Sequence, residues 1–415
     1  MHDLKEVRKN SDFYKKKLDD RNSKIDIKKI LDLDIANRSL IQKKETLEQE
    51  KKKISKSKEE INFTKSKELS LEIDKILKEQ QIKQGQLNLL LSNLPNIALN
   101  DVPIGTDESF NKIVRKEGSI KKFNFKVKSH SEIGEINDQI DFKTSSKLSG
   151  SRFVVLKDKF ALLERALINF MIDTHTNKFD YVEISPPLIV NEEIMFGTGQ
   201  LPKFEEDQFE LKLSKEETRK FLIPTAEVVL TNLFRESVIE NKKLPIRLVA
   251  GTPCFRKEAG SYGKDTKGIM RQHQFYKVEL VSIINPESNN QELKRMLNCA
   301  EDILRLLEIP YQVSLLCTGD MGFSSEKTYD IEAWIPYEKR YREISSCSSC
   351  GTFQARRMNT KFKNSDGNNY VGTINGSGLA VGRLLIALVE NCQKEDGSIS
   401  IPVPLRKYMN NMDKI

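Results

Sequence analysis

Two stretches of the chain, FRKEAG and RQHQFYKVE, place charged or aromatic side chains two positions apart. These are Arg256 and Glu258 in the first stretch, and Arg271, His273, Phe275, Lys277 and Glu279 in the second. Strand side chains alternate between two faces, so each set shares one face of its strand. Burying unpaired charge costs several kcal/mol, so this face does not belong to a core. The pattern indicates a ligand-binding surface on a β-hairpin, with a solvent-exposed hairpin as the alternative.

The connection between the two stretches, residues 259–270, is about a dozen residues long and rich in glycine and lysine. Its members of these types are Gly260, Gly263, Gly268, Lys264 and Lys267. Loops of this length inside compact domains are usually functional or disordered. Positive charge in such a loop suits closure over phosphates, which favours the ligand-binding interpretation.

Two further polar segments fit the same ligand. Residues 343–346 (EISS) put a carboxylate and two hydroxyls at the end of a predicted strand. Residues 376–378 (GSG) precede a predicted helix that carries Arg383, and a helix N-terminus suits an anion, although such glycines more often reflect packing. Carboxylates beside arginines, without a histidine pair or a nucleophile elbow, indicate Mg²⁺-ATP held for in-line attack on phosphorus rather than hydrolysis by a triad.

Several segments resemble the signature motifs of the class II aminoacyl-tRNA synthetases. FRKEAGSYGKDTKGIMRQHQFYKVE is similar to the second motif, GSGLAVGRLLIALVEN to the third, and KFDYVEISPPLIV to the first, with Pro187 as its proline. More narrowly, LIPTAEVVLTN, REISSCSS followed by FQARRM, NGSGLAVGR and VPIGTDESFNKIVR resemble the seryl-tRNA synthetase family of the bacterial type. The resemblance covers nearly the whole chain, with the motifs in the family's order.

This resemblance implies a serine–tRNA ligase that uses ATP and Mg²⁺ and needs no zinc. The catalytic residues would be Arg256 and Arg383. The ATP site would comprise Arg256, Lys257, Glu258, Arg271, Phe275, Glu343, Ile344, Ser345, Ser346 and Arg383, with Glu343 and Ser346 also holding Mg²⁺ through ATP. L-Serine would contact Thr225, Ala226, Glu227, Arg256, Glu279 and Ser377. The family also implies a homodimer that charges tRNA(Ser), and leaves open tRNA(Sec) as a second substrate.

The sequence departs from the family pattern just before FQARR. The family usually has an acidic residue there, and this chain has Thr352 after an unusual Cys350-Gly351. The resulting CxxC, formed with Cys347, lacks the second ligand pair that structural zinc sites normally need. We interpret the departure as local loop variation and leave its effect on ATP affinity open.

The first 94 residues form a region of their own, in which Gly85 is the sole glycine and proline does not occur. Mostly apolar residues recur every seven positions, and Lys83 and Gln80 are the polar exceptions. The first series is Leu33, Leu40, Leu47, Ile54 and Ile61. Two interleaved series follow: Leu69, Ile76, Lys83 and Leu90, and Ile73, Gln80, Leu87 and Leu94. Sustained heptads in two consecutive segments predict an antiparallel coiled-coil arm, with a turn near 62–66. The first ~20 residues are predicted to form one separate short helix.

Lysines gather toward the expected tip of this arm, at Lys51, Lys52, Lys53, Lys56 and Lys58. Charge is routine on the outer faces of coiled coils, so solubility alone would explain them. Phosphate contact is the alternative, and the net charge of +8 also suits a polyanionic partner. Given the resemblance, we expect these lysines to contact the long variable arm of tRNA(Ser).

The chain is predicted to have three parts: an N-terminal helical domain over 1–94, a linker over 95–147 and a catalytic domain over 148–415. In the third part, helices are expected at 160–175 and 379–390, and strands at 181–184, 247–257, 272–281, 329–335 and 341–346. Strands that follow one another through long hairpin loops indicate an α+β fold, with an antiparallel sheet flanked by helices.

Composition favours a protein of the reduced cytoplasm. Hydrophobic residues make up 38% of the chain and charged residues 31%. No apolar run reaches the ~18 residues of a membrane span, and the N-terminus lacks the apolar core of a secretory signal. The six cysteines are scattered rather than arranged as a disulfide framework.

Two other functions remain open from the sequence. A seryl transferase acting on a carrier protein would use the same activation chemistry, but such relatives lack the long arm. A catalytically inactive RNA-binding paralogue would be free to lose Arg256, Glu258, Glu279 or Arg383, and this chain keeps all four.

Overall fold

The computed structural model describes residues 1–55, 60–212, 218–259, 268–365 and 367–415. The chain divides into two compact units, Met1–Ile97 and Ala98–Ile415. Within the described ranges, no helix combines the length and the apolar composition needed to cross a membrane.

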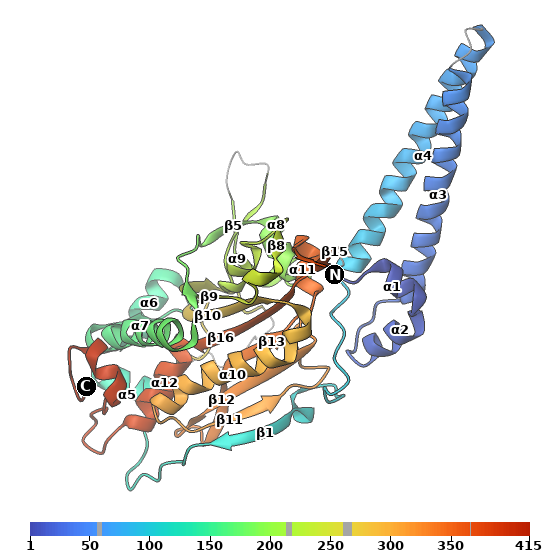
Figure 1. Cartoon of the computed structure of the whole chain (residues 1–415). Helices are drawn as coiled ribbons and strands as arrows, with labels where there is room; N and C mark the ends of the chain where they lie inside the picture. Colours follow the sequence, from blue (N-terminus) through green and yellow to red (C-terminus); the bar gives the residue numbers. More distant parts are fainter. Residues whose placement is uncertain (56–59, 213–217, 260–267, 366) are drawn as a thin grey trace. The chain divides into compact units, whose positions relative to one another are not determined.

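The first unit is helical. Its helices are α1 (Leu4–Lys9), α2 (Ser11–Asp19), α3 (Ile27–Ile54) and α4 (Glu60–Ser92). The helices α3 and α4 lie side by side and antiparallel (Figure 1). The heptad residues Leu69, Ile76 and Leu87 of α4 are buried. With 28 residues, α3 is about 42 Å long at the usual helical rise. The predicted coiled-coil arm is confirmed, and we call α3 and α4 the helical arm.

Two local predictions in this unit are wrong. The turn expected at 62–66 lies inside α4, which begins at Glu60, and residues 56–59 lie outside the described part. Lys65 of α4 already pairs with Glu50 of α3 at 3.3 Å, which shows that the chain has reversed before residue 65. The short helix expected in the first ~20 residues is two helices, because the chain leaves helical geometry at Asn10.

A polar contact interrupts the apolar seam of the helical arm. Asn37 of α3 is buried, and its Nδ2 donates to Gln84 Oε1 at 2.7 Å. Gln80 Nε2 donates to Asn37 Oδ1 at 3.3 Å. Because the two glutamines come from the other helix, these bonds fix how α3 and α4 align.

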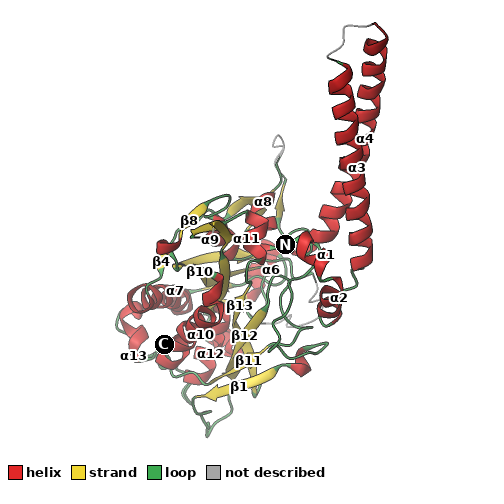
Figure 2. Cartoon of the chain, turned by 45° about the vertical axis from the view of Figure 1, so that its right-hand side comes forward, coloured by secondary structure: helices red, strands yellow, loops and turns green. Residues whose placement is uncertain are grey.

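The second unit is built on an eight-stranded sheet (Figure 2). Its strands, in spatial order, are β1 (Lys112–Glu117), β11 (Tyr311–Leu315), β12 (Lys327–Ile335), β13 (Arg340–Ser349), β16 (Gly372–Ala380), β10 (Gln274–Ile284), β9 (Ile246–Phe255) and β4 (Val182–Glu183). Neighbours in the sheet are antiparallel except β4 and β9. The predicted α+β class is confirmed.

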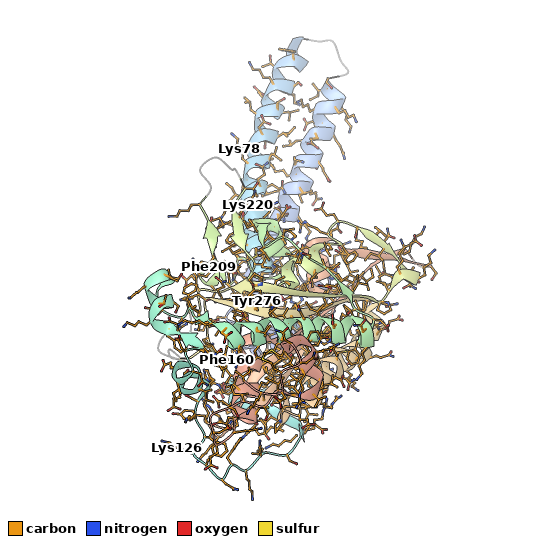
Figure 3. The ribbon with its side chains drawn as sticks, turned by 90° about the vertical axis from the view of Figure 1, so that its left-hand side faces the viewer. Lys78, Lys126, Phe160, Phe209, Lys220 and Tyr276 are labelled. Carbon is orange, nitrogen blue, oxygen red and sulfur yellow. The ribbon has the colours of Figure 1, made fainter. Side chains whose placement is uncertain are left out.

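Three helices pack on one face of this sheet: α7 (Asp158–Phe179), α10 (Asn289–Leu306) and α12 (Val381–Cys392). Their apolar residues and those of the strands form the main core. Phe160 of α7, labelled in Figure 3, is fully buried in it. β10 places Val278 and Leu280 in this core, so its alternate side chains face the other side of the sheet.

Shorter elements surround the sheet. The remaining helices are α5 (His130–Ile136), α6 (Phe142–Ser149), α8 (Glu192–Thr198), α9 (Glu227–Asn232), α11 (Phe353–Met358) and α13 (Val403–Arg406). The remaining strands are β2 (Ile140–Asp141), β3 (Val155–Leu156), β5 (Ile189–Asn191), β6 (Glu210–Leu211), β7 (Lys220–Leu222), β8 (Val238–Glu240), β14 (Lys361–Asn364) and β15 (Gly367–Tyr370). Residues 95–147, expected to be a linker, contribute the edge strand β1 and the helices α5 and α6.

The sequence predicted a helix that begins at the glycines of NGSG, and this prediction is wrong. Residues 375–378 lie within β16, and α12 begins only at Val381. The glycines are there because neighbours approach closely: a Cβ on Gly376 would lie 2.7 Å from Cys347 Sγ, and one on Gly378 would lie 2.6 Å from His175 Nε2.

This packing can be tested with Gly376→Ala. The added methyl group has no room, so we expect the free energy of unfolding to fall by about 1–3 kcal/mol. Gly382→Ala in α12 is the matched control, because its nearest atom would lie at 3.5 Å. The control should be neutral or stabilising by up to about 1 kcal/mol. Urea denaturation measures both, and equal stability of the two variants would contradict the close approach at Gly376.

Candidate active site

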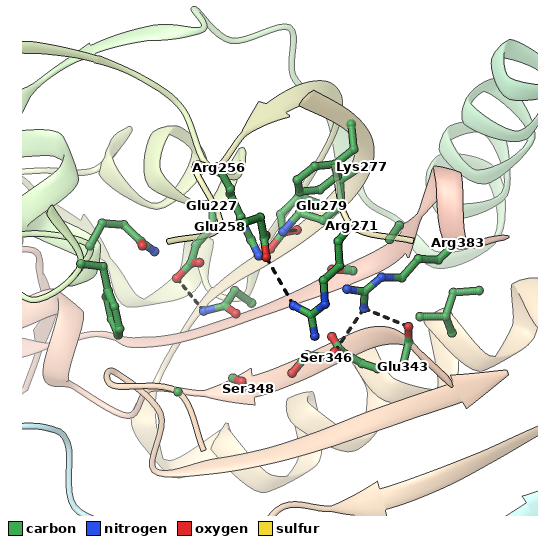
Figure 4. A pocket seen from close by; sticks show the side chains of 18 of the residues that line it. Glu227, Arg256, Glu258, Arg271, Lys277, Glu279, Glu343, Ser346, Ser348 and Arg383 are labelled. Atoms are coloured by element: carbon green, nitrogen blue, oxygen red, sulfur yellow. Dashed lines mark hydrogen bonds and ion pairs between the residues drawn. The ribbon is translucent and has the colours of Figure 1, made fainter. Parts of the chain in front are cut away.

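A cavity of about 350 Å³ lies on the sheet face that the three helices leave open (Figure 4). Four carboxylates and four cations are among the residues that line it. They are Glu227, Glu258, Glu279 and Glu343, with Arg256, Arg271, Lys277 and Arg383.

Arg256 and Glu258 reach the cavity from a turn and not from a strand. β9 ends at Phe255, two residues earlier than predicted, and Glu258 has a left-handed φ of 53°. Arg256 Nε donates to the Pro224 carbonyl at 3.2 Å, and its guanidinium lies 5.5 Å from the centroid of the Phe275 ring. Both side chains therefore line the cavity, as the sequence predicted, although strand alternation is not what places them there.

Two other arginines that line the cavity pair with carboxylates. Arg271 Nη1 lies 3.3 Å from Glu258 Oε2, and Arg383 Nη1 lies 3.1 Å from Glu343 Oε2. Arg383 Nε also donates to the Met270 carbonyl at 3.3 Å. The positive charge of Arg383 is the main cause of the lowered pKa of Glu343, so this carboxylate stays ionised.

The remaining carboxylates are deeper. Glu279 is only 2% exposed, and its Oε2 lies 2.6 Å from Lys277 Nζ. Burial raises the pKa of Glu279, and the Lys277 ammonium opposes that rise. Burial, followed by the charge of Glu279, raises the pKa of Glu227 to about 7. Glu227 Oε1 accepts hydrogen bonds from Gln354 at 2.7 Å and Asn375 at 2.8 Å.

Most of the expected site residues converge on this cavity, including Phe275, Ile344, Ser346 and Ser377 beside the eight charged residues. Thr225, Ala226, Lys257 and Ser345 are not among its lining residues. The Lys257 ammonium lies over the Phe209 ring at 5.8 Å, and Ser345 Oγ donates to the Ser377 carbonyl at 2.6 Å. Thr225 Oγ1 accepts from the Glu227 amide at 3.2 Å.

The lysines expected to contact tRNA belong to the other unit. Lys51, Lys52 and Lys53 occupy the last turn of α3. Lys56 and Lys58 lie outside the described residues.

Some lining residues were not assigned a role from the sequence. Lys277 lies between Phe275 and Glu279 on the face that the sequence had singled out, so its signal was present. Asn375 stands two residues before Ser377 on β16, and the same period could have found it. Thr198 ends α8, and residues 199–200 and 322–325 lie outside helices and strands, so strand periodicity gives no signal for them.

Cys350 and Thr352, which depart from the family pattern near FQARR, have different surroundings in the structure. Cys350 lines the cavity, and its Sγ accepts from Asn375 Nδ2 at 3.6 Å. Thr352 is not a lining residue; its Oγ1 accepts from Arg356 Nε at 3.3 Å. Of the two, Cys350 is therefore the one placed to affect a bound ligand.

The donor set defines what the cavity can hold. Three arginines suit phosphate oxygens, and a Phe275 ring suits a nucleobase. The oxygens of Glu343 and Ser346 are hard ligands of the kind that Mg²⁺ prefers. The deeper carboxylates next to these groups suit an ammonium and a hydroxyl, so the cavity offers the donors and acceptors that a nucleotide and a small amino acid need.

Comparison with known proteins identifies the two parts of the chain. Residues 208–392 match the model of the tRNA synthetase class II core domain (G, H, P, S and T), and residues 1–98 match the seryl-tRNA synthetase N-terminal domain. The second unit, Ala98–Ile415, thus contains a class II aminoacyl-tRNA synthetase core.

Individual relatives narrow the assignment. The chain is 58% identical over 416 residues to a serine–tRNA ligase of Pelagibacter ubique (strain HTCC1062), covering 100% of this chain and 99% of that protein. It superposes on seryl-tRNA synthetase from Pyrococcus horikoshii complexed with ATP with a TM-score of 0.90, at 34% identity, covering 100% of this chain and 99% of that one. It also matches a cytoplasmic serine–tRNA ligase from Naegleria fowleri in complex with AMP, at a TM-score of 0.86, 28% identity and coverage of 98% and 95%. The chain belongs to the seryl-tRNA synthetase family.

The raised pKa of Glu227 predicts a pH dependence of stability. The folded chain holds this proton up to about pH 7, whereas an ordinary glutamate loses it near pH 4.5. The contribution of Glu227 to the free energy of unfolding therefore falls as the pH rises from 4.5 to 7. Glu227→Gln removes the titration and keeps an acceptor oxygen for Gln354 and Asn375. We expect E227Q to lose less unfolding free energy over this range than the wild type, as measured by urea denaturation.

Glu193→Gln, an exposed position on α8, is the control and should leave the pH dependence as it is in the wild type. A slope for E227Q that equals the wild-type slope would contradict a buried, titrating Glu227.

Proposed function

We propose that this cavity activates L-serine with ATP, and that the chain then transfers the seryl group to the 3′ end of tRNA(Ser). The observation that carries this proposal is the cavity itself, in which the buried Glu279 and the half-buried Glu227 line the same space as three arginines. The relatives named above are called serine–tRNA ligases or seryl-tRNA synthetases, and those solved with ATP or AMP support a nucleotide site.

ATP would occupy the end of the cavity that contains the arginines. Arg256, Arg271 and Arg383 would bind the triphosphate, and the adenine would stack on Phe275. Mg²⁺ held by Glu343 and Ser346 would neutralise phosphate charge that the carboxylates alone would repel. Lys257, Glu258, Ile344 and Ser345 complete the proposed ATP set.

Serine would occupy the deeper end of the cavity. Glu279 would accept from its ammonium and its hydroxyl, with Thr225, Ala226, Glu227 and Ser377 completing the proposed pocket. A pocket that expects a hydroxyl leaves its polar groups unpaired when alanine binds, which can discriminate by orders of magnitude.

The first step needs no protein base. A serine carboxylate oxygen attacks the α-phosphorus, the bond to pyrophosphate breaks, and seryl-adenylate forms. Arg256 and Arg383 would hold the reactants in line and stabilise the charge that develops on phosphorus. In the second step, the 3′-terminal hydroxyl of the tRNA attacks the seryl carbonyl and AMP leaves.

The helical arm would bind the long variable arm of tRNA(Ser) through shape and phosphates, with Lys51, Lys52 and Lys53 near one end of α3. We further propose homodimerisation and the charging of tRNA(Sec), which rest on family membership. A cytoplasmic location and a three-part division at residues 94 and 147 are also proposed, and these rest on composition and sequence pattern. Neither alternative, a seryl transferase to a carrier protein or an inactive RNA-binding paralogue, is supported by the relatives found.

Serine-dependent exchange of pyrophosphate into ATP tests the activation step. The wild type should catalyse this exchange with serine far better than with alanine. Arg256→Ala should lower the rate by at least about 100-fold, because it removes charge stabilisation at the phosphate. Equal exchange with alanine would contradict the serine pocket, and a near-normal rate for R256A would remove Arg256 from the site.

The arm is tested separately by changing Lys51, Lys52 and Lys53 together to alanine. We expect weaker tRNA(Ser) binding and a flatter salt dependence, because fewer phosphate contacts release fewer counterions. Filter binding from low to high salt measures this, and pyrophosphate exchange should stay at the wild-type rate. Unchanged binding at every salt concentration would assign these lysines to solubility.

A further inference from the structure

The end of the β9–β10 connection is held from two sides. The Ile269 amide donates to His130 Nε2 at 3.4 Å, and the Met270 carbonyl accepts from Arg383 Nε at 3.3 Å. Ile269 and Met270 are both buried and both line the cavity. The backbone that leads into Arg271 is therefore fixed just before it enters the candidate ATP site.

The His130 ring is itself oriented by Glu390. Glu390 Oε1 accepts from the His130 backbone amide at 3.0 Å and lies 2.9 Å from His130 Nδ1. Glu390 Oε2 accepts from the Tyr337 amide at 3.1 Å, and the glutamate is only 1% exposed. A carboxylate at Nδ1 keeps the ring proton there, so Nε2 presents its lone pair to the Ile269 amide.

Gly268 shows how closely the His130 ring approaches the backbone here. Its φ is +84°, and a Cβ at this position would lie 2.7 Å from His130 Nε2. The left-handed backbone and the adjacent imidazole both favour glycine here. The imidazole is thus packed against the backbone at Gly268, directly beside Ile269.

One helix provides both ends of this arrangement. α12 carries Arg383 near its start and Glu390 near its end. Arg383 contacts the Met270 carbonyl directly, and Glu390 acts on Ile269 through His130. A single rigid element thus connects the phosphate-binding arginine to the backbone that carries Met270 and Arg271.

We propose that His130 is a positioning residue for the nucleotide: through Ile269 it fixes the backbone that presents Met270 and Arg271 to ATP. This inference rests on the proposed function of the cavity. It gives α5, which lies in the segment expected to be a linker, a task in the activation step.

Two substitutions at this position separate the roles of the two ring nitrogens. His130→Asn keeps a donor for Glu390 but has no atom that reaches Ile269, whereas His130→Gln places an amide oxygen close to the position of Nε2. In pyrophosphate exchange, we expect H130N to raise the KM for ATP by about 10-fold and to change the KM for serine by less than about 2-fold. H130Q should recover most of the lost ATP affinity.

Hydrogen exchange of the peptide that contains Ile269 tests the same contact without any activity. In the ligand-free protein, exchange should be faster in H130N than in the wild type or H130Q. Ser129→Ala is the control, because it removes the cap of the same helix and leaves the ring partners in place. S129A should match the wild type in both assays. If H130N folds poorly, Glu390→Gln is the alternative variant. It should raise the KM for ATP selectively as well, but by a smaller factor.

Three outcomes would overturn the proposal: an unchanged KM for ATP in H130N, an equal rise in the KM values for ATP and serine, or the same effects in S129A. Absence of serine-dependent exchange in the wild type would instead overturn the proposed function, and the hydrogen-exchange comparison would still decide whether His130 holds Ile269.

Discussion

Four carboxylates and four cations face one cavity, and the surrounding elements keep the deeper acids beside compensating groups. Glu279 would be costly to bury alone, and Lys277 lies 2.6 Å from it on the same strand. Glu227 is held by two side-chain amides, and its raised pKa reflects what burial next to Glu279 costs. An incoming ammonium would add positive charge where two acids share one lysine. The charges of the cavity therefore favour a ligand that brings an ammonium group close to these two acids.

The sheet supplies this arrangement because its two faces are used differently. Alternate residues of β10 enter the core under α7 and α12 or line the cavity, so the position of Glu279 follows from the burial of Val278 and Leu280. The glycines of β16 let the neighbouring strand and α7 approach closely, which keeps the cavity floor in place. Loss of a tight contact beneath the sheet would therefore displace groups on its open face.

Periodicity in the sequence predicted the parts of the molecule that are regular. The coiled-coil heptads and the alternation around Phe275 and Glu279 identified the arm, the sheet and one face of the cavity. Turn geometry was not predictable in the same way: Glu258 adopts a left-handed backbone, and no spacing rule anticipates it. The role of Gly376 depends on Cys347, a neighbour 29 positions away in the chain, and only the fold brings them together. The contact between His130 and Ile269 could not be predicted from the sequence either, because the two residues are far apart in the chain and only the fold brings them together.

The polar contact of Asn37 with Gln80 and Gln84 has a consequence for the geometry of the helical arm. An apolar seam alone would tolerate sliding of α3 along α4 by one heptad, which corresponds to about 10 Å. A buried amide that finds its partners in a single alignment excludes that shift. The lysines at the end of α3 are thereby kept at a constant height above the base of their own unit, and the proposed contact with tRNA would depend on that constancy.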